Sequence, residues 1–223
     1  MSNFKKLYDV GYFSQRNFND KLRLESFLSE KKLIENISDF NGKICDVGCS
    51  TGEFLTFIDW SGEKFGMEIS EFAIEIAEKH GISFKKNIET EINFFDVVIF
   101  RGTIQHLPHP FLFIEHAFRS LKPGGFVVFL ATPNSNSFIY KLKNTLPVLV
   151  PNLNFYIPSD VTLINACKNF GFEFYSIEKP YLTSPYSNIF IDSLKFIKMV
   201  FSGSKPNFPW PGNMMNLIMK KPL

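Results

Sequence analysis

Two acidic residues flank a glycine-rich turn in the first third of the sequence. Residues 44–54 read ICDVGCSTGEF, with Asp46 near the end of an apolar run, and Glu68 ends the next apolar run. A buried strand, a tight glycine turn and a helix begin a βαβ unit whose strand end holds a nucleoside-containing cofactor. A carboxylate about twenty residues further along can accept hydrogen bonds from both ribose hydroxyls. The spacing therefore predicts an adenosine-containing cofactor, with Glu68 at its ribose.

The turn residues indicate which adenosine compound this would be. A dinucleotide site has glycine at the first, third and sixth turn positions, and these are Gly48, Ser50 and Glu53 here. Ser50 obstructs part of the approach to a pyrophosphate, and Glu53 places a carboxylate where its charges would lie. Like charges about 4 Å apart cost roughly 4 kcal/mol at an effective dielectric of 20. The turn therefore favours a cationic cofactor without phosphate, such as S-adenosylmethionine, over NAD. At the end of the strand, the Asp46 carboxylate would accept N–H bonds of the turn and lie near the ammonium group of that cofactor, with fixing the turn alone as the alternative.

Four motifs together resemble those of the class I S-adenosylmethionine-dependent methyltransferases. They are the turn residues Asp46, Gly48, Ser50 and Gly52, then Glu68, the stretch FFDVVIFRGTIQHLPHP (94–110) and the stretch LKPGGFVVF (121–129). The resemblance covers roughly residues 40–179 and, more weakly, 214–220. Two positions depart from the family pattern: Asn87 stands where an adenine-binding acid is expected, and Gln105 where glutamate is common.

The resemblance implies cofactor contacts for several further residues. Phe54 would cover the methionine moiety, with packing in the helix core as the alternative. Met67 and Ile69 would flank the adenine, with burial in the strand as the alternative for Met67. Asn87 would bond the adenine edge, with an ordinary loop position as the alternative. In this family, the backbone carbonyls that hold the methionyl amine lie at the positions of Arg101 and Gly102. The Arg101 side chain would pair with a ligand carboxylate or form a surface ion pair.

Catalysis needs little covalent help, because the sulfonium is already electrophilic and the enzyme must mainly align the reactants and exclude water. His106 is the candidate general base, since histidine titrates near neutrality and can take a proton from an attacking hydroxyl. Holding the local structure of its loop is the alternative role. Tyr8, Tyr12 and Tyr181 are candidates for orienting the substrate.

The alternation of apolar strands with amphipathic segments predicts an α/β fold. We expect a doubly wound, seven-stranded, mostly parallel sheet, and the family adds an antiparallel edge. The predicted strands are 43–47, 63–68, 82–86, 94–100, 126–131, 172–178 and 214–220, and the predicted helices are 18–37, 51–58, 70–80, one from Pro110, 160–170 and 189–201. Residues 1–40 would form a helical cap segment on a methyltransferase domain at 41–223. Inserts at 132–158 and 180–213 would shape a substrate site, with a dimer contact or a mobile surface loop as the alternative.

The composition excludes several other classes of protein. The chain has 223 residues and a net charge of +2, which is too small to indicate a nucleic-acid-binding face. Its three cysteines have no metal-site spacing and fit a reducing cytoplasm. No apolar run is long enough to span a membrane. We therefore expect no nucleic-acid or membrane partner, and either a monomer or a homodimer.

The sequence thus predicts S-adenosylmethionine-dependent methyl transfer to a small-molecule acceptor, with a hydroxyl of a sugar or another metabolite as the finer hypothesis. An NAD(P)-dependent oxidoreductase or nucleotide-sugar enzyme is the first alternative. It would need a Tyr-x-x-x-Lys pair, but Asn144 stands where Tyr140 would require lysine. A cofactor-binding module without catalysis is the second alternative, because positioning leaves little trace in a sequence.

Overall fold

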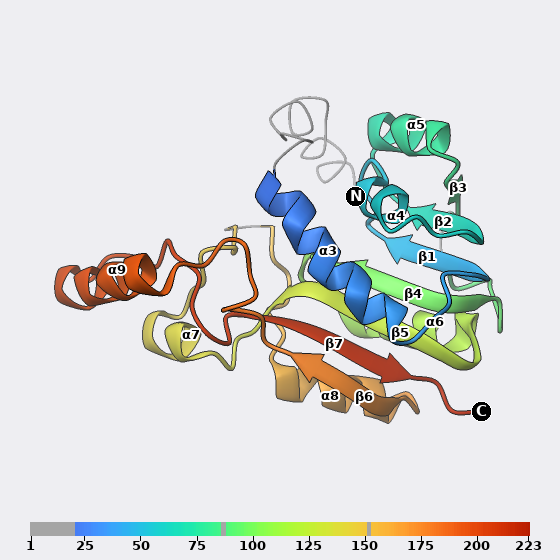
Figure 1. Cartoon of the computed structure of the whole chain (residues 1–223). Helices are drawn as coiled ribbons and strands as arrows, with labels where there is room; N and C mark the ends of the chain where they lie inside the picture. The colour runs from blue at the N-terminus through green and yellow to red at the C-terminus, as the bar shows by residue number, and fades with distance from the viewer. Residues whose placement is uncertain (1–20, 86–87, 151–152) are drawn as a thin grey trace.

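A seven-stranded sheet forms the centre of the protein in the computed structural model, which describes residues 21–85, 88–150 and 153–223. The predictions for Tyr8, Tyr12 and Asn87 lie outside these residues. The strand order is β3-β2-β1-β4-β5-β7-β6 (Figure 1). The strands are β1 (Lys43–Val47), β2 (Glu63–Met67), β3 (Ser83–Phe84), β4 (Phe95–Arg101), β5 (Leu121–Pro133), β6 (Glu173–Glu178) and β7 (Met214–Lys220).

The pairing directions confirm the predicted mostly parallel sheet with an antiparallel edge. β1 pairs in parallel with both β2 and β4, and β4 pairs in parallel with β5. β7 runs antiparallel to both β5 and β6. The carboxyl ends of β1, β2, β4 and β5 therefore meet at one edge of the sheet, where a doubly wound fold binds its ligands.

Helices cover both faces of the sheet, as a parallel sheet requires. On one face, α3, α4 and α5 pack with Ile44, Val97 and Ile99. On the other face, α6 and α8 pack with Cys45 and Val98, because successive residues of a strand point to opposite faces. The covering helices are α3 (Lys21–Glu35), α4 (Glu53–Phe57), α5 (Glu71–Lys79), α6 (Pro110–Ser120) and α8 (Asp160–Asn169).

Both inserts extend beyond the carboxyl ends of the strands (Figure 1). The first contains α7 (Phe138–Lys143), which the sequence analysis missed, and the second contains α9 (Ile189–Ser202). Ser137 caps α7 by accepting a hydrogen bond from the Tyr140 N–H. The two helices share a small apolar core of their own, which includes Ile139 and Met199.

The prediction for the fifth strand was too short at its start. We expected Lys122-Pro-Gly-Gly to be a turn before a strand at 126, but β5 already begins at Leu121, which pairs with Phe95. The register then shifts, so that Val97 pairs with Phe126. The glycines are accommodated as an irregularity inside the strand, with Gly124 at φ 80°, a conformation that glycine adopts without strain.

Candidate cofactor and acceptor site

The turn after β1 has the backbone geometry of a ligand cradle. Gly48, Ser50 and Gly52 all have positive φ, at 78°, 55° and 76°. A Cβ on Gly48 would lie 2.5 Å from the methyl carbon of Thr103, and one on Gly52 would lie 2.2 Å from Ile82. Both glycines are therefore required by close packing as well as by conformation.

Glu68 holds this turn in place. Its carboxylate accepts hydrogen bonds from the N–H of Ser50 at 3.0 Å, of Ile69 at 2.7 Å and of Ser70 at 3.0 Å. The carbonyl of Met67 accepts two more from the turn, including one from the Gly48 N–H at 2.8 Å. Glu68 thus sits at the carboxyl end of β2 beside the turn, where the sequence places a ribose ligand.

Asp46 is buried at 3% exposure, and the structure revises the role expected of it. We expected its carboxylate to accept turn N–H bonds, but those bonds go to Met67 and Glu68. Its Oδ1 is buried and has no hydrogen-bond partner among the described residues. Burial raises the pKa of Asp46 to about 8; Arg101 opposes this rise, and the charges of Glu30 and Glu68 add to it. A buried polar atom without a partner is costly, so a ligand that bonds this oxygen would offset that cost.

Arg101 forms a buried ion pair with Glu30 of α3, a partner that the sequence analysis did not identify. The Arg101 Nε donates to Glu30 Oε2 at 2.6 Å, and the Arg101 Nη2 donates to Glu30 Oε1 at 3.3 Å. The guanidinium also lies over the ring of Phe27, 4.3 Å from its centroid. Burial raises the pKa of Glu30, and Arg101 counteracts the rise. The pair is neither a surface ion pair nor free for a ligand carboxylate, and it joins α3 to the carboxyl end of β4.

Glu53 is also paired, and this weakens one step of the sequence argument. Arg23 of α3 lies 2.6 Å from the Glu53 carboxylate, so the charge expected to repel a pyrophosphate is balanced by a neighbouring cation. The preference for a cofactor without phosphate therefore rests on two features. Ser50 obstructs the approach of a pyrophosphate to the turn, and Asp46 has an unpartnered carboxylate oxygen.

The apolar candidates separate into buried and exposed residues. Phe54 is 3% exposed and packs edge-to-face on Phe27 at 5.2 Å, which places it in the helix core. Met67 is 8% exposed, whereas Ile69 is 48% exposed. Gly102 has φ 61°, and its carbonyl accepts a bond from the Gln105 side chain at 2.9 Å.

His106 lies in the short 3-10 turn Ile104–His106 after β4. Its Nδ1 lies 2.8 Å from the carbonyl oxygen of Leu153. Because a carbonyl only accepts, Nδ1 carries the proton and the Nε2 of the neutral ring has the lone pair. That lone pair lies 3.3 Å from the Gln105 side-chain nitrogen. His106 therefore ties the loop to the first insert through Nδ1, and its Nε2 lies beside the Gln105 side-chain nitrogen. The lining of the cavity described next includes Gln105 but not His106.

A cavity of about 480 Å³ lies between α3, the ends of β4 and β5, and both inserts. Arg101 and Glu30 line it, and the charges of both act on the pKa of Asp46. Its apolar lining includes Leu146, Phe208 and Trp210. Both inserts thus contribute to one cavity.

Two buried amides line this cavity, and the sequence analysis did not identify either as a ligand group. Gln105 Oε1 and both side-chain polar atoms of Asn213 are buried without a hydrogen-bond partner among the described residues. The cavity surface is mostly apolar, as is typical of small-molecule sites, but charged, hydroxyl and amide side chains also contribute to its lining. The sequence signals for them were weak: Gln105 stands where glutamate is common, and Asn213 follows the turn-like run Trp210-Pro-Gly.

Tyr181 does not have the free hydroxyl expected of a substrate contact. It is 7% exposed, and its hydroxyl donates to Asp192 Oδ2 at 3.0 Å. Burial and this bond raise the pKa of the tyrosine. The residue holds the second insert together.

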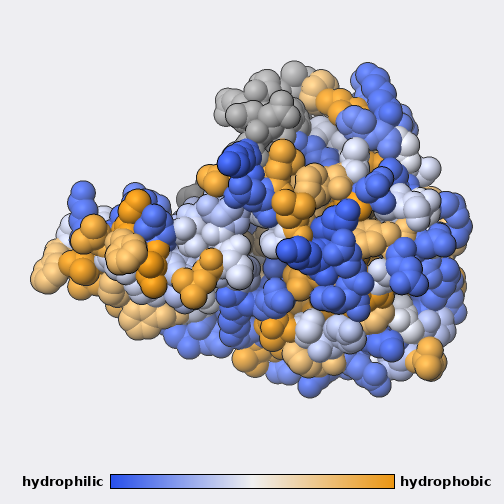
Figure 2. Space-filling model, viewed as in Figure 1, coloured by the Kyte–Doolittle hydropathy of each residue, from blue (hydrophilic) through white to orange (hydrophobic). Residues whose placement is uncertain are grey.

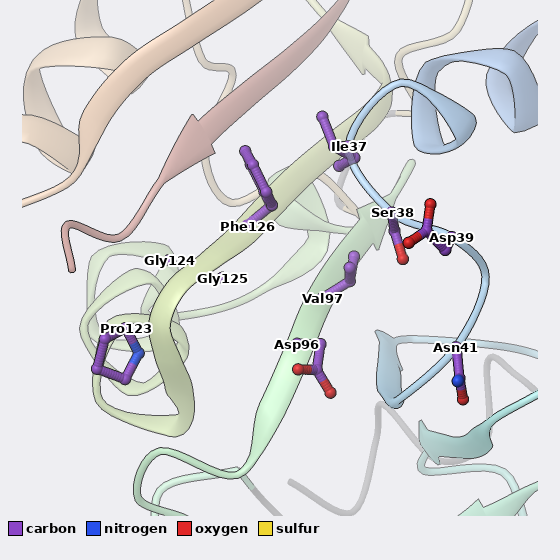
Figure 3. A pocket seen from close by; sticks show the side chains of 10 residues that line it. All are labelled: Ile37, Ser38, Asp39, Asn41, Asp96, Val97, Pro123, Gly124, Gly125 and Phe126. Carbon is purple, nitrogen blue, oxygen red and sulfur yellow. The ribbon is translucent and has the colours of Figure 1, made fainter.

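A second cavity of about 320 Å³ opens at the other ends of the strands (Figure 3). It lies between the loop after α3, including Asp39, and the starts of β4 and β5. The Asp96 carboxylate in its wall accepts bonds from the Lys43 N–H at 2.7 Å and from Lys122 at 2.8 Å. Asp96 is thus already bonded within the protein, and it lies at the opposite end of β4 from Arg101.

The site fits S-adenosylmethionine. The glycine turn would admit the nucleoside, Glu68 would meet the ribose, and the orphaned Asp46 oxygen would suit the methionyl ammonium. No group of three or more metal-ligating side chains occurs in the described part of the chain.

The fold and the turn together define a class I S-adenosylmethionine-dependent methyltransferase. The family described as a methyltransferase domain matches residues 15–177, and the chain belongs to this family. S-adenosylmethionine is accordingly its cofactor.

Three relatives illustrate the similarity. A demethylmenaquinone methyltransferase of Lactococcus lactis is 33% identical over 53% of this chain and 56% of its own length. A ubiquinone biosynthesis O-methyltransferase of Hydrogenovibrio crunogenus is 28% identical over 64% of this chain and 63% of its own. A crystal structure of a methyltransferase from Thermotoga maritima has a TM-score of 0.63 at 21% identity, covering 87% of this chain and 89% of that one. The chain thus spans about half to two-thirds of the length of the first two of these proteins.

Proposed function

We propose that the protein transfers a methyl group from S-adenosylmethionine to the oxygen of a hydroxyl group on the ring of a small, largely apolar acceptor. Hydroxylated quinone precursors are the leading case. The observation that carries this proposal is the cavity of about 480 Å³ at the end of β4, whose surface is mostly apolar and whose wall contains Trp210. A ring with few polar groups suits this lining better than a sugar, which carries a hydroxyl on most carbons and would bury many polar atoms unpaired.

The relatives support this finer choice. One is named demethylmenaquinone methyltransferase and another ubiquinone biosynthesis O-methyltransferase, and only the second name specifies an oxygen acceptor. Gln105 Oε1 would accept a hydrogen bond from an acceptor hydroxyl, and the Asn213 amide could bond a second ring oxygen from the other side of the cavity. These contacts would orient one hydroxyl toward the cofactor.

When bound, the cofactor supplies an electrophilic methyl group, and the protein contributes alignment. The walls formed by α3 and the two inserts would exclude water, and the buried amides would fix the acceptor. Loss of the hydroxyl proton requires an acceptor group, and we propose His106 Nε2 for it. The Leu153 carbonyl would stabilise the resulting imidazolium through Nδ1.

A methylation assay with a panel of acceptors tests this proposal. Labelled S-adenosylmethionine would be incubated with a dihydroxybenzoate, a short-chain hydroxyquinol and a free or nucleotide-linked sugar. We expect turnover of the phenolic compounds and none of the sugars. Turnover of sugars alone would contradict the acceptor class but not the cofactor.

Asn213→Leu gives a sharper version of the same test. It removes two unpartnered polar atoms from the cavity wall without changing side-chain volume greatly. We expect KM for the phenolic acceptor to rise about tenfold, as loss of a hydrogen bond to a ligand predicts, with cofactor affinity unchanged. Asn207→Leu, at a more exposed position of the same lining, is the matched control.

A further inference from the structure

The outward face of α9 is apolar. Phe190, Leu194, Ile197 and Phe201 are 81%, 68%, 51% and 87% exposed. Their spacing of four, three and four residues aligns them on one side of the helix. Figure 2 shows hydrophobic residues on the surface of this projecting part of the molecule. We call these four side chains the α9 stripe.

The opposite side of α9 is firmly packed, so the exposure of the stripe is not a sign of a loose helix. Met199 is 1% exposed, and the ring of Phe196 stacks on Trp210 at 4.6 Å. Asp192 is 2% exposed and accepts bonds from the Tyr181 hydroxyl and the Asn188 N–H. The helix therefore presents the stripe to solvent in a fixed orientation.

The charges around the stripe are almost all positive. The insert at 180–213 contains three lysines, Lys195, Lys198 and Lys205, and a single acid, the buried Asp192. The first insert contains Lys141 and Lys143 and no acidic residue. Lys195 and Lys198 are both exposed; on the helix, Lys198 lies beside the stripe and Lys195 lies further round, toward the packed side. The two inserts thus concentrate positive charge in a chain whose net charge is only +2.

We propose that α9 docks on the surface of an anionic lipid bilayer, with the α9 stripe among the outer acyl chains and the lysines at the headgroups. Exposed aromatic and aliphatic residues flanked by lysines are the pattern of helices that lie in a membrane interface, and lysines near an anionic surface add attraction. The proposal departs from the expectation of no membrane partner. It concerns a helix lying on a membrane, because no helix in the described ranges could cross one.

A bilayer fits the charges of this face better than a second copy of the chain. Two copies joined about a two-fold axis through α9 would bring their lysines together with no exposed acid of the inserts to oppose them, and like charges repel. An anionic lipid surface supplies the opposite charge. The inference does not depend on the proposed acceptor, because docking requires neither cofactor nor substrate.

Sedimentation with lipid vesicles tests the proposal on the full chain. We expect binding to vesicles that contain phosphatidylglycerol and much weaker binding to vesicles of phosphatidylcholine alone. Lys195→Gln with Lys198→Gln should lower affinity for the anionic vesicles about 30-fold, since each lysine near the surface contributes about a factor of five. Phe190→Ser with Phe201→Ser should lower it at least about tenfold.

Matched variants elsewhere on the surface serve as controls. Lys79→Gln with Lys168→Gln changes two exposed helix lysines outside the inserts, and Ile92→Ser changes a side chain that is 65% exposed; both should bind vesicles like the unaltered chain. Circular dichroism would verify that all variants fold. The proposal is overturned if the chain does not bind phosphatidylglycerol vesicles or if the α9 variants bind as the controls do. A dimer in light scattering that Phe190→Ser with Phe201→Ser dissociates, without vesicle binding, would instead identify a second copy as the occupant.

Discussion

Asp46 is the residue whose chemistry departs most from that of a free amino acid. Its pKa is raised to about 8 by burial, with Glu30 and Glu68 adding to the effect of burial and Arg101 opposing it. The unliganded protein therefore holds Asp46 protonated at neutral pH. A cationic ammonium beside it favours the charged form, so cofactor binding would release this proton.

This raised pKa predicts that cofactor affinity depends on pH. Below about pH 8 binding must first remove the proton, so the association constant should rise by up to about tenfold per pH unit and level off above pH 8. Titration calorimetry with S-adenosylmethionine at pH 6, 7 and 8 measures this, and buffers of different ionisation enthalpy count the released proton. Asp46→Asn should bind more weakly and lose this pH dependence. A slope that survives in that variant would assign the proton to another group.

The same acid gives the unliganded protein a pH-dependent stability. The folded pKa lies above the unfolded value, so the native state binds more protons between about pH 4 and pH 8. Its stabilising contribution is complete below the unfolded pKa and is lost as pH rises toward 8. This loss of stability at higher pH follows from burying an acid at a position that suits a ligand rather than the fold.

At the scale of elements, α3 is coupled to the sheet through one buried ion pair. Glu30→Ala would leave Arg101 buried without its carboxylate, and loss of one partner of a buried pair costs about 3–5 kcal/mol. Urea unfolding measures this change in the free energy of unfolding. Glu30→Leu with Arg101→Met should recover most of the loss, because an apolar pair has no charge to desolvate.

The same helix supplies the control for this prediction. Glu25 pairs with Lys21 at 3.8 Å, with side chains 43% and 88% exposed, and exposed pairs contribute about 0–1 kcal/mol. Glu25→Ala should therefore change stability by less than about 1 kcal/mol. Equal effects of Glu25→Ala and Glu30→Ala would mean that the ion pair does not hold α3.

Elements with a local signal were predictable from the sequence, and long-range pairs were not. The bounds of β1 and β7 agree with those predicted, because each is an apolar run between polar residues. The ion pair of Glu30 with Arg101 joins residues 71 positions apart. Its one local trace is a carboxylate on the apolar face of α3, between Phe27 and Ile34. The unpartnered amide atoms, Gln105 Oε1 and both of Asn213, likewise became visible only when the inserts had been placed over the sheet.

At the scale of the whole molecule, the inserts separate two tasks. We propose that the sheet and its glycine turn hold the cofactor, whereas the inserts line the cavity and carry α9. The apolar core shared by α7 and α9 makes the inserts one packed unit. Changes on the outer face of that unit should therefore leave the cofactor site intact.

Binding of the cofactor should stabilise the whole fold. A ligand that binds only the native state at 100 times its Kd adds about 2.7 kcal/mol, and about 2–4 °C per kcal/mol is typical of a chain of this size. We expect S-adenosylmethionine to raise Tm by roughly 5–11 °C in a thermal-shift assay, and NAD to leave it unchanged. An equal shift with NAD would mean that the turn accepts a diphosphate after all.

Glu68→Ala locates this stabilisation in the molecule. Loss of a charge-assisted ribose contact should weaken affinity about 10- to 100-fold, so at the same cofactor concentration the rise in Tm should fall to about half or less. The comparison is made with and without cofactor for each variant, which removes any effect of Glu68 on the turn itself. Glu75→Ala, at an exposed position of α5, should keep the full shift. A full shift in Glu68→Ala would place the ribose elsewhere along the edge of the sheet.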